Sequence, residues 1–216
     1  MWERIFKERK SWGRYPPEEL VRFIATNYYG EFNRSGIKIL EIGCGPGAGP
    51  GWYIAREGFS YFGIDGSETA IQKATQRFSD EHLSGEFFKG DFCRLPWNAD
   101  TFDCVIDIAS LQHNSESDTR IILGEVHRVL KGLGRHFSLT ARSGCWGDGL
   151  GTIIGPACYA DISEGPYQGM GTIRFATLES LLSMYSAFHN INLEYSVRSV
   201  NSLRHEISNW IVTCQK

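Results

Sequence analysis

The chain has 216 residues, of which 42% are hydrophobic and 22% charged, and its formal net charge is −3. This composition is typical of one globular domain (1–216), and the slight excess of acids disfavours a nucleic-acid partner. The charged N-terminal segment excludes a secretory signal, and no apolar run approaches the about 18 residues of a membrane span, so we expect no membrane association.

The six cysteines are scattered through the chain and form no Cys-x-x-Cys pair. This spacing argues against a zinc site and a disulfide framework, and it favours reduced thiols in a cytoplasmic protein. The acids do not cluster with histidines at ligand spacing either, so we expect no metal.

The first 30 residues are expected to form a helical leader. A charged segment that carries aromatic residues precedes Pro16 and Pro17, and a helix should begin there because proline suits the first helical turn. Glu18 and Glu19 follow, where acids complement the positive end of the helix dipole. Residues 20–24 supply the apolar face of this helix.

Residues 37–140 alternate between short apolar runs and amphipathic segments. The pattern predicts strands at 38–42, 60–64, 86–89, 102–108 and 134–140, and helices at 52–57, 68–78 and 118–130. Ser67 is the expected N-cap of the second of these helices. Strands joined in this way imply right-handed crossovers and a parallel sheet with helices on both faces, which is an α/β fold.

The remainder of the chain has a different pattern. Residues 141–175 are rich in glycine and lack clear periodicity, so we expect a long loop on the substrate side of the sheet. Residues 176–216 contain a helix with a threonine cap at 177–188 and two strands at 190–199 and 206–216. These two strands should pair antiparallel at one edge, which completes a mostly parallel, seven-stranded sheet with an antiparallel last strand.

The first strand ends in a glycine-rich stretch, EIGCGPGAGPG, at residues 41–51. Ligands of open parallel sheets bind outside the carboxyl ends of the strands, where this loop, Asp65 and Asp91 fall. A dinucleotide would suit the loose G-x-G-x-x-A pattern and an acid about 20 residues further on. S-adenosylmethionine also needs an acid for its ribose, but it has no pyrophosphate.

Three features favour S-adenosylmethionine. Glu41 lies where a pyrophosphate would approach, and a buried anion there suits a cation instead. Asp91 supplies a second acid, placed for an adenine amino group. We also expect no separate catalytic domain of the kind that a dehydrogenase needs.

Five runs, ILEIGCGPGAG, GIDGSETAIQKA, GDFCRLPW, FDCVIDIASLQH and EVHRVLKGLGR, together resemble the class I S-adenosylmethionine-dependent methyltransferases. The most similar group is that of small-molecule enzymes with an E-x-G-x-G-x-G loop, of methyltransferase type 11. The resemblance covers residues 37–140 and implies a Rossmann-like fold and methyl transfer to a small-molecule acceptor. The chain departs from the family at Gly49-Pro50-Gly51, which lengthens the loop where relatives begin a helix.

The resemblance also implies roles for individual residues. Asp65 would accept hydrogen bonds from both ribose hydroxyls, Asp91 would accept from the adenine amino group, and Glu41 would support the loop. The full implied cofactor-binding set is Glu41, Gly43, Cys44, Gly45, Gly47, Asp65, Gly66, Ser67, Gly90, Asp91, Phe92, Asp107, Ile108 and Ala109. For three of the acids, the alternative to cofactor binding is a local structural role. Asp65 would cap a helix, Asp91 would be a turn residue, and Asp107 would accept hydrogen bonds from loop amides.

His113 is the candidate catalytic residue. It follows the fourth strand at the mouth of the expected site, where a histidine can take a proton from an acceptor hydroxyl or amine. The alternative is that its ring only holds a loop carbonyl.

The leader is expected to close over the cofactor as a lid, because aromatic side chains offer large apolar areas. Its aromatic residues are Trp2, Phe6, Trp12 and Tyr15, and Arg14 is placed to contact the cofactor carboxylate. The long loop offers a polar acceptor the side chains of Trp146, Asp148, Tyr159, Asp161, Glu164 and Tyr167. Two rival functions stay open: a dinucleotide-dependent reductase and a non-catalytic module that binds the same cofactor.

Overall fold

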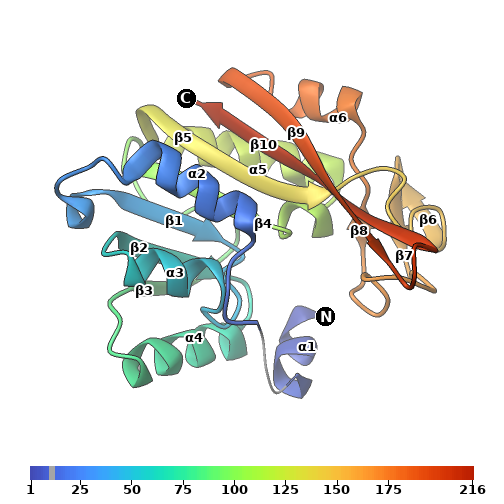
Figure 1. Ribbon diagram of the computed structural model, residues 1–216, viewed down its shortest axis with the longest axis horizontal. Helices are drawn as coiled ribbons and strands as arrows, with labels where there is room; N and C mark the ends of the chain where they lie inside the picture. Colours follow the sequence, from blue (N-terminus) through green and yellow to red (C-terminus); the bar gives the residue numbers. More distant parts are fainter. Residues whose placement is uncertain (10–12) are drawn as a thin grey trace.

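The structure, a computed structural model, describes residues 1–9 and 13–216. Its centre is a seven-stranded sheet in the order β3-β2-β1-β4-β5-β10-β9 (Figure 1). The strands are β1 (Lys38–Ile42), β2 (Ser60–Asp65), β3 (Glu86–Lys89), β4 (Phe102–Ile108), β5 (Leu130–Ala141), β9 (His189–Val200) and β10 (His205–Gln215). The mostly parallel sheet expected from the sequence is confirmed.

Strand direction follows from the connections. The first five strands are parallel to one another, and each pair is joined by a crossover, most of them helical. β10 runs antiparallel to both of its neighbours, β5 and β9. No helix separates β9 from β10, so the chain returns directly as a hairpin, and β10 enters the sheet between β5 and the edge strand β9.

Helices cover both faces of the sheet (Figure 1). On one face lie α2 (Glu18–Tyr28), α3 (Pro50–Arg56) and α4 (Glu68–Asp80), and on the other lie α5 (Glu116–Val129) and α6 (Leu178–Met184). The predicted cap of α4 is confirmed, since the Ser67 side chain accepts from the Ala70 N–H over 3.1 Å. α6 begins at its Thr177 cap as predicted but ends at Met184, four residues before the predicted end.

Neighbouring residues of a central strand face opposite cores. In β1, Ile39 packs with α2 to α4, whereas Leu40 packs with α5 and α6. In β4 the same alternation places Ile106 on the first face and Val105 on the second. This period of two assigns Glu41 to the face of Ile39 and Asp107 to the face of Val105.

The segment expected as a loop, residues 141–175, contains a second sheet, which corrects that expectation. Its three antiparallel strands are β6 (Thr152–Gly155), β7 (Cys158–Ala160) and β8 (Ile173–Arg174). The small sheet has its own hydrophobic cluster, made of Ala141, Cys145, Ile162, Tyr167, Ile173 and Phe175. Strands of two to four residues are too short to show an alternating pattern, so periodicity does not reveal them.

The unusual Gly49-Pro50-Gly51 begins α3, two residues earlier than predicted. Gly49 precedes the helix with a φ of +62°, and Pro50 takes the first helical position. A Cβ on Gly51 would lie 2.6 Å from the Tyr61 ring. Because glycine has no Cβ, the start of α3 can pack directly against this side chain of β2. The departure from the family pattern thus has a packing reason.

Three short helices complete the described chain. They are α1 (Trp2–Glu8), η1 (Arg34–Gly36) and η2 (Leu111–His113). α1 packs against α4 beside the carboxyl ends of the parallel strands (Figure 1). Among the helices of the described residues, none has both the length and the apolar character that a bilayer crossing demands.

Candidate functional site

A cavity of about 1080 Å³ lies at the carboxyl ends of β1, β2, β3 and β4. Its walls include twelve of the fourteen predicted cofactor-binding residues: Glu41, Gly43, Cys44, Gly45, Asp65, Gly66, Ser67, Gly90, Asp91, Phe92, Ile108 and Ala109. His113 lines the same cavity. The volume is slightly above the roughly 300–1,000 Å³ typical of ligand pockets, which leaves room for a second reactant beside a cofactor.

The glycine loop owes its shape to left-handed backbone. Gly43, Gly45 and Gly47 all have positive φ, between +52° and +72°, which L-residues with a side chain rarely adopt. A Cβ on Gly43 would also come within 1.8 Å of Ser110 Oγ, so the loop can approach the end of β4 only as bare backbone. Glycine in this loop therefore does more than form a turn, because at Gly43 it also allows the backbone to approach the end of β4.

Asp65 is a buried carboxylate at the end of β2. Its Oδ2 accepts from the Gly45 N–H over 3.0 Å, and its Oδ1 accepts from the Ser67 N–H over 2.8 Å. Burial raises the pKa of Asp65 above 3.8, while both amide hydrogen bonds act in the opposite direction. Asp65 thus joins the glycine loop to the start of α4, and each oxygen keeps a lone pair for a further donor.

Glu41 is buried in the wall beneath the loop. Its Oε2 accepts the hydroxyl hydrogen of Tyr61 over 2.6 Å, and it also interacts with the Gly51 amide. Burial raises the pKa of Glu41 well above its usual value, and the nearby acids Asp107 and Asp65 raise it further. A cationic ligand in this cavity would favour the ionised form.

The β3 end contributes a more open part of the wall. Asp91 is exposed, and its Oδ1 accepts from the Cys93 N–H over 2.9 Å, a turn contact that leaves the other oxygen for a ligand. Phe92 is half-buried beside it. Lys89, which pairs with Glu68 over 3.3 Å, also lines the cavity. It was not among the predicted residues, because a single lysine in a short strand carries no distinctive signal.

Two of the predicted residues do not line the cavity. Gly47 faces α4, where a Cβ would meet Ala74 at 3.0 Å. Asp107 is fully buried, and its Oδ1 accepts from the amides of Ser110 and Leu111. Its Oδ2 accepts from Ser138 Oγ over 2.7 Å, and burial raises its pKa to about 6. For Asp107 the alternative role as a partner of loop amides is the one observed.

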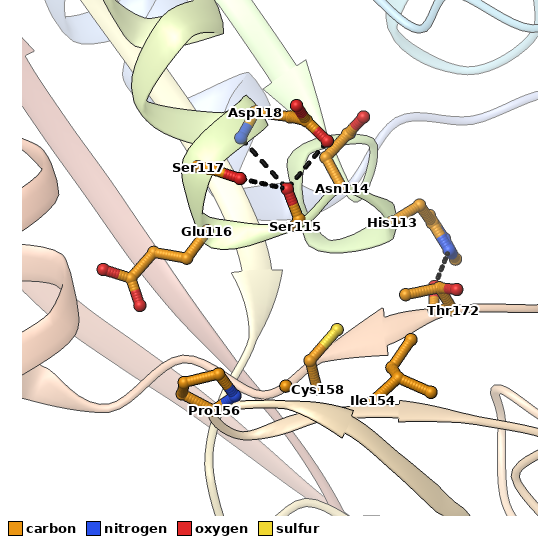
Figure 2. Close-up of a pocket in the computed structure, with 11 residues that line it drawn as sticks. His113, Asn114, Ser115, Glu116, Ser117, Asp118, Ile154, Pro156, Cys158 and Thr172 are labelled. Atoms are coloured by element: carbon orange, nitrogen blue, oxygen red, sulfur yellow. Dashed lines mark hydrogen bonds between the residues drawn. The ribbon is translucent and has the colours of Figure 1, made fainter.

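His113 lies where η2 meets the small sheet. One ring nitrogen, Nδ1, is 2.9 Å from the Thr172 carbonyl oxygen, as Figure 2 shows. A carbonyl oxygen only accepts, so Nδ1 carries the hydrogen and Nε2 carries a lone pair. Burial lowers the pKa of His113 to about 4, so the ring is neutral at pH 7.

His113 also separates two cavities. A second cavity of about 530 Å³ lies between the start of α5 and the small sheet, and its walls include His113, Asn114, Cys158 and Ile154 (Figure 2). His113 and Asn114 line the main cavity as well. The predicted hydrogen bond to a loop carbonyl is therefore present, and it fixes the ring beside the main cavity.

Several residues of the leader line the main cavity. α1 contributes Trp2, Glu3 and Phe6 to its walls, and Trp2 meets His113 edge-on with ring centroids 4.6 Å apart. Glu3 accepts from Ser67 Oγ over 2.5 Å and from Thr69 Oγ1 over 2.6 Å. The hydrogen bonds from Ser67 and then Thr69 lower the pKa of Glu3 to about 2, so Glu3 stays ionised at neutral pH and accepts these bonds as a carboxylate.

Other predicted leader contacts differ. Arg14 pairs with Glu81 over 3.0 Å and does not line the cavity. Tyr15 lines it while remaining largely exposed. Trp12 lies outside the described residues.

Of the six side chains expected to face an acceptor from residues 141–175, only Tyr167 lines the cavity. Trp146 stacks on His205 with centroids 4.2 Å apart, and Asp148 accepts from the Gly144 N–H over 2.8 Å. The segment instead presents Pro166 and Met170 beside Tyr167. Because the small sheet fixes which residues turn inward, the polar surface expected from composition lies elsewhere.

No group of three or more His, Cys, Asp or Glu side chains that could hold a metal occurs in residues 1–9 and 13–216.

Known proteins of similar sequence include methyltransferases. A family model described as a methyltransferase domain matches residues 39–134. The sterol 24-C-methyltransferase of Kluyveromyces lactis is 35% identical over 105 residues, which cover 45% of this chain and 28% of that enzyme. An uncharacterized methyltransferase of Schizosaccharomyces pombe is 36% identical over 100 residues, which cover 39% of this chain and 68% of that protein.

The fold has a solved counterpart of nearly equal extent. A SAM-dependent methyltransferase of Methanosarcina mazei superposes with a TM-score of 0.72 at 22% identity, covering 95% of this chain and 99% of that one. The Rossmann-like sheet and the sequence matches together define a methyltransferase. The chain belongs to the class I S-adenosylmethionine-dependent methyltransferases. It spans less than a third of the length of the sterol methyltransferases that it matches, 28% in the Kluyveromyces lactis enzyme.

Proposed function

We propose that this protein transfers the methyl group of S-adenosylmethionine to a small-molecule acceptor. The observation that carries the proposal is the cavity at the strand ends, because it joins the glycine loop, Asp65 and the leader with His113. The cofactor brings an activated methyl group on a sulfonium, so the protein's task is to position both reactants and to exclude water.

The residues present fit this cofactor. Asp65 keeps one lone pair on each oxygen after accepting from Gly45 and Ser67, and two adjacent ribose hydroxyls can donate to that pair. Glu41 is a buried acid, and its negative form would repel a phosphate but attract an ammonium or sulfonium. Asp91 and Phe92 offer an acceptor and an apolar ring at the β3 end for adenine.

His113 is proposed as the residue that takes the acceptor's proton. Its Nε2 is the acceptor nitrogen of a neutral ring, and the Thr172 carbonyl holds the ring in that tautomer. The same carbonyl would stabilise the imidazolium formed when Nε2 gains a proton. Trp2 of the leader meets this ring edge-on, and its apolar surface would help to keep water from the reacting groups.

The small-molecule acceptor and the cellular setting are supported by bulk properties. The net charge of −3 disfavours a nucleic-acid substrate. All six cysteines are free, as in the reducing cytoplasm, where we place the protein.

The test is a titration with S-adenosylhomocysteine and, separately, with NADH, followed by melting temperature. A ligand at a hundredfold excess over its Kd adds about 2.7 kcal/mol of stability, which is a shift of several degrees in a chain of this size. We expect S-adenosylhomocysteine alone to give this shift. A shift with NADH alone would show a dinucleotide-dependent enzyme instead.

A second measurement separates an enzyme from a non-catalytic module. The protein is incubated with methyl-labelled S-adenosylmethionine and an extract of small metabolites, and label in the metabolite fraction is counted. Binding without any transfer would contradict the catalytic part of the proposal. Labelling of protein or nucleic acid in preference to metabolites would contradict the acceptor class.

A further inference from the structure

One part of the main cavity is lined by the start of the leader, by η2 and by the segment between β7 and β8, and we call this part the acceptor wall. It consists of Met1, Trp2, His113, Pro166, Tyr167 and Met170. Met1 packs onto Gly171, where a Cβ would come within 2.0 Å of its sulfur. The start of the leader thus meets the small-sheet segment beside this part of the cavity.

The side chains of the acceptor wall are mainly apolar; besides His113, the polar groups are the Trp2 indole N–H and the Tyr167 hydroxyl. The hydroxyl is engaged within the protein, where it donates to Asn209 Oδ1 over 3.4 Å, so Tyr167 offers mainly its ring. The acids of residues 141–175 lie outside the cavity. A sugar or another polyhydroxylated acceptor would leave most of its hydroxyls without partners here, at a large cost in affinity.

Two amide side chains also line the main cavity, and in each of them one polar atom is engaged within the protein. Gln112 Oε1 accepts from the Ala141 N–H over 2.7 Å. Asn114 Nδ2 donates to the Ser110 carbonyl over 3.0 Å. Among the six residues of the acceptor wall, His113 offers a ring nitrogen with a lone pair, Nε2, to a hydroxyl group, whereas the indole of Trp2 offers only an N–H donor.

Resting on the proposed function, we propose that the methyl acceptor is a phenol: a flat, apolar aromatic molecule whose hydroxyl hydrogen-bonds to His113 Nε2. Trp2, Tyr167 and Met170 offer the surfaces on which an aromatic ring packs well. The ring then fills the apolar wall, and the oxygen is left facing the cofactor side of the cavity.

In the proposed step, the phenol oxygen uses a lone pair to form a bond to the methyl carbon, and its proton passes to His113 Nε2. The carbon–sulfur bond breaks, and its electron pair stays on sulfur, which becomes a neutral thioether. The products are an aryl methyl ether, S-adenosylhomocysteine and a protonated His113, which returns its proton to solvent.

The choice of a phenol over an aliphatic alcohol follows from acidity. Burial lowers the pKa of His113 to about 4, so its ring is a weak base. A phenolic hydroxyl, with a pKa of about 10, releases its proton far more readily than an aliphatic hydroxyl does. A weak base assists the more acidic of these two groups more effectively.

The experiment compares four probes of graded chemistry: 2-naphthol, 2-decalol, 2-methoxynaphthalene and methyl glucoside. Transfer from methyl-labelled S-adenosylmethionine is measured for each, and binding to protein saturated with S-adenosylhomocysteine is measured by calorimetry. We expect both naphthalenes to bind and only 2-naphthol to be methylated. Methylation of 2-decalol or methyl glucoside at an equal or higher rate overturns the proposal, and so does failure of both naphthalenes to bind.

Two variants test the residues. Met170→Asp should raise KM for 2-naphthol by about tenfold or more, since a charge replaces apolar wall, and should leave S-adenosylhomocysteine affinity unchanged. Gln168→Asp is the matched control, because Gln168 is exposed in the same segment and does not line the cavity. Equal effects of the two substitutions would contradict the proposed wall.

His113→Ala should lower kcat for 2-naphthol by about a hundredfold, with a smaller change in KM, and should remove the acidic limb of the pH–rate profile. Equal losses in cofactor affinity and turnover would make His113 a binding residue and overturn the step. The calorimetric titration with S-adenosylhomocysteine keeps the two proposals apart: if it fails, the proposed function fails, and if it succeeds while the aromatic probes do not bind, only the phenol proposal fails.

Discussion

Tyr61 donates its hydroxyl hydrogen to Glu41 Oε2 over 2.6 Å, and both side chains are buried where α3 begins. The pair spans neighbouring strands, with Glu41 on β1 and Tyr61 on β2. It links the wall of the cavity to the side chain against which Gly51 packs. A change at either residue should therefore affect both ligand binding and the packing of α3.

Glu41→Gln should make the cofactor-free protein less sensitive to alkaline pH. Burial raises the pKa of Glu41 well above 4.5. A carboxyl group raised in this way stabilises the fold fully below its unfolded pKa, and that contribution is lost as pH rises through the raised pKa. Glutamine keeps an acceptor for Tyr61 and cannot ionise, so urea unfolding at increasing pH should show the variant gaining stability relative to the wild type.

The same substitution should weaken S-adenosylmethionine binding and remove its pH dependence. In the wild type, a bound cation favours the ionised form of Glu41, so affinity should rise with pH as the proton is released. Glu86→Gln, an exposed change at the start of β3, serves as the control and should behave as the wild type. A wild-type affinity that does not vary with pH would show that Glu41 keeps one charge state throughout.

Gly51→Ala should destabilise the protein by about 1–3 kcal/mol, because the new methyl group must displace the Tyr61 ring that lies 2.6 Å away. The melting temperature should fall by roughly 2–4 °C for each kcal/mol. Gly124→Ala is the matched control: Gly124 is exposed in α5 with no atom within 4 Å of the added Cβ, so that change should stabilise the helix slightly. Two variants of equal stability would contradict the packing role of Gly51.

Asp65→Asn should reduce affinity for S-adenosylhomocysteine by about ten- to a hundredfold. The amide retains one acceptor oxygen for the Gly45 or Ser67 N–H, but it no longer offers a charged acceptor to both ribose hydroxyls. Calorimetry gives the affinity, and a melting curve of the free variant reports any loss of loop stability separately. Asp80→Asn, exposed at the end of α4, should bind normally; unchanged affinity in Asp65→Asn would place the ribose elsewhere.

Glu3→Gln should loosen α1 from α4. Hydrogen bonds from Ser67 and Thr69 lower the pKa of Glu3 to about 2, so in the wild type this contact is present above pH 4.5 and is lost as pH falls toward 2. At neutral pH, hydrogen exchange should show faster exchange of the α1 amides in the variant and faster release of S-adenosylhomocysteine. Glu8→Gln, which removes only a 3.9 Å pair with Arg4, should change neither.

The predictions made from the sequence were most accurate where local chemistry decides structure. Ser67 caps α4 and Thr177 caps α6 because a side-chain oxygen three residues before a free amide needs no distant partner. The strands were found because short runs such as residues 102–108 are mostly apolar and lie between turn signals, as expected of a central parallel strand. Residues 152–174 carry no such signal, so their small sheet was taken for loop.

The site was predictable where it follows directly from a strand end. Asp65 is the last residue of β2 and Asp91 follows the end of β3 by two residues, so the topology alone brings them to the cavity. Asp107 lies within β4, one residue before its end, and its position in the alternation of the strand turns it toward Ser138 and the η2 amides. Met170 and Lys89 could not be identified because an apolar or basic residue in these settings has no distinctive spacing.

Periodicity, caps and short spacings were enough to establish the order of strands and helices, the glycine loop and the acids around it. Which side chains face a ligand depends instead on tertiary packing. Glu41 meets Tyr61, Glu3 meets Ser67, and Met1 meets Gly171 across separations of 20, 64 and 170 residues in the chain. Contacts between residues so far apart depend on strand register and on how the packed layers close, and no local pattern encodes them.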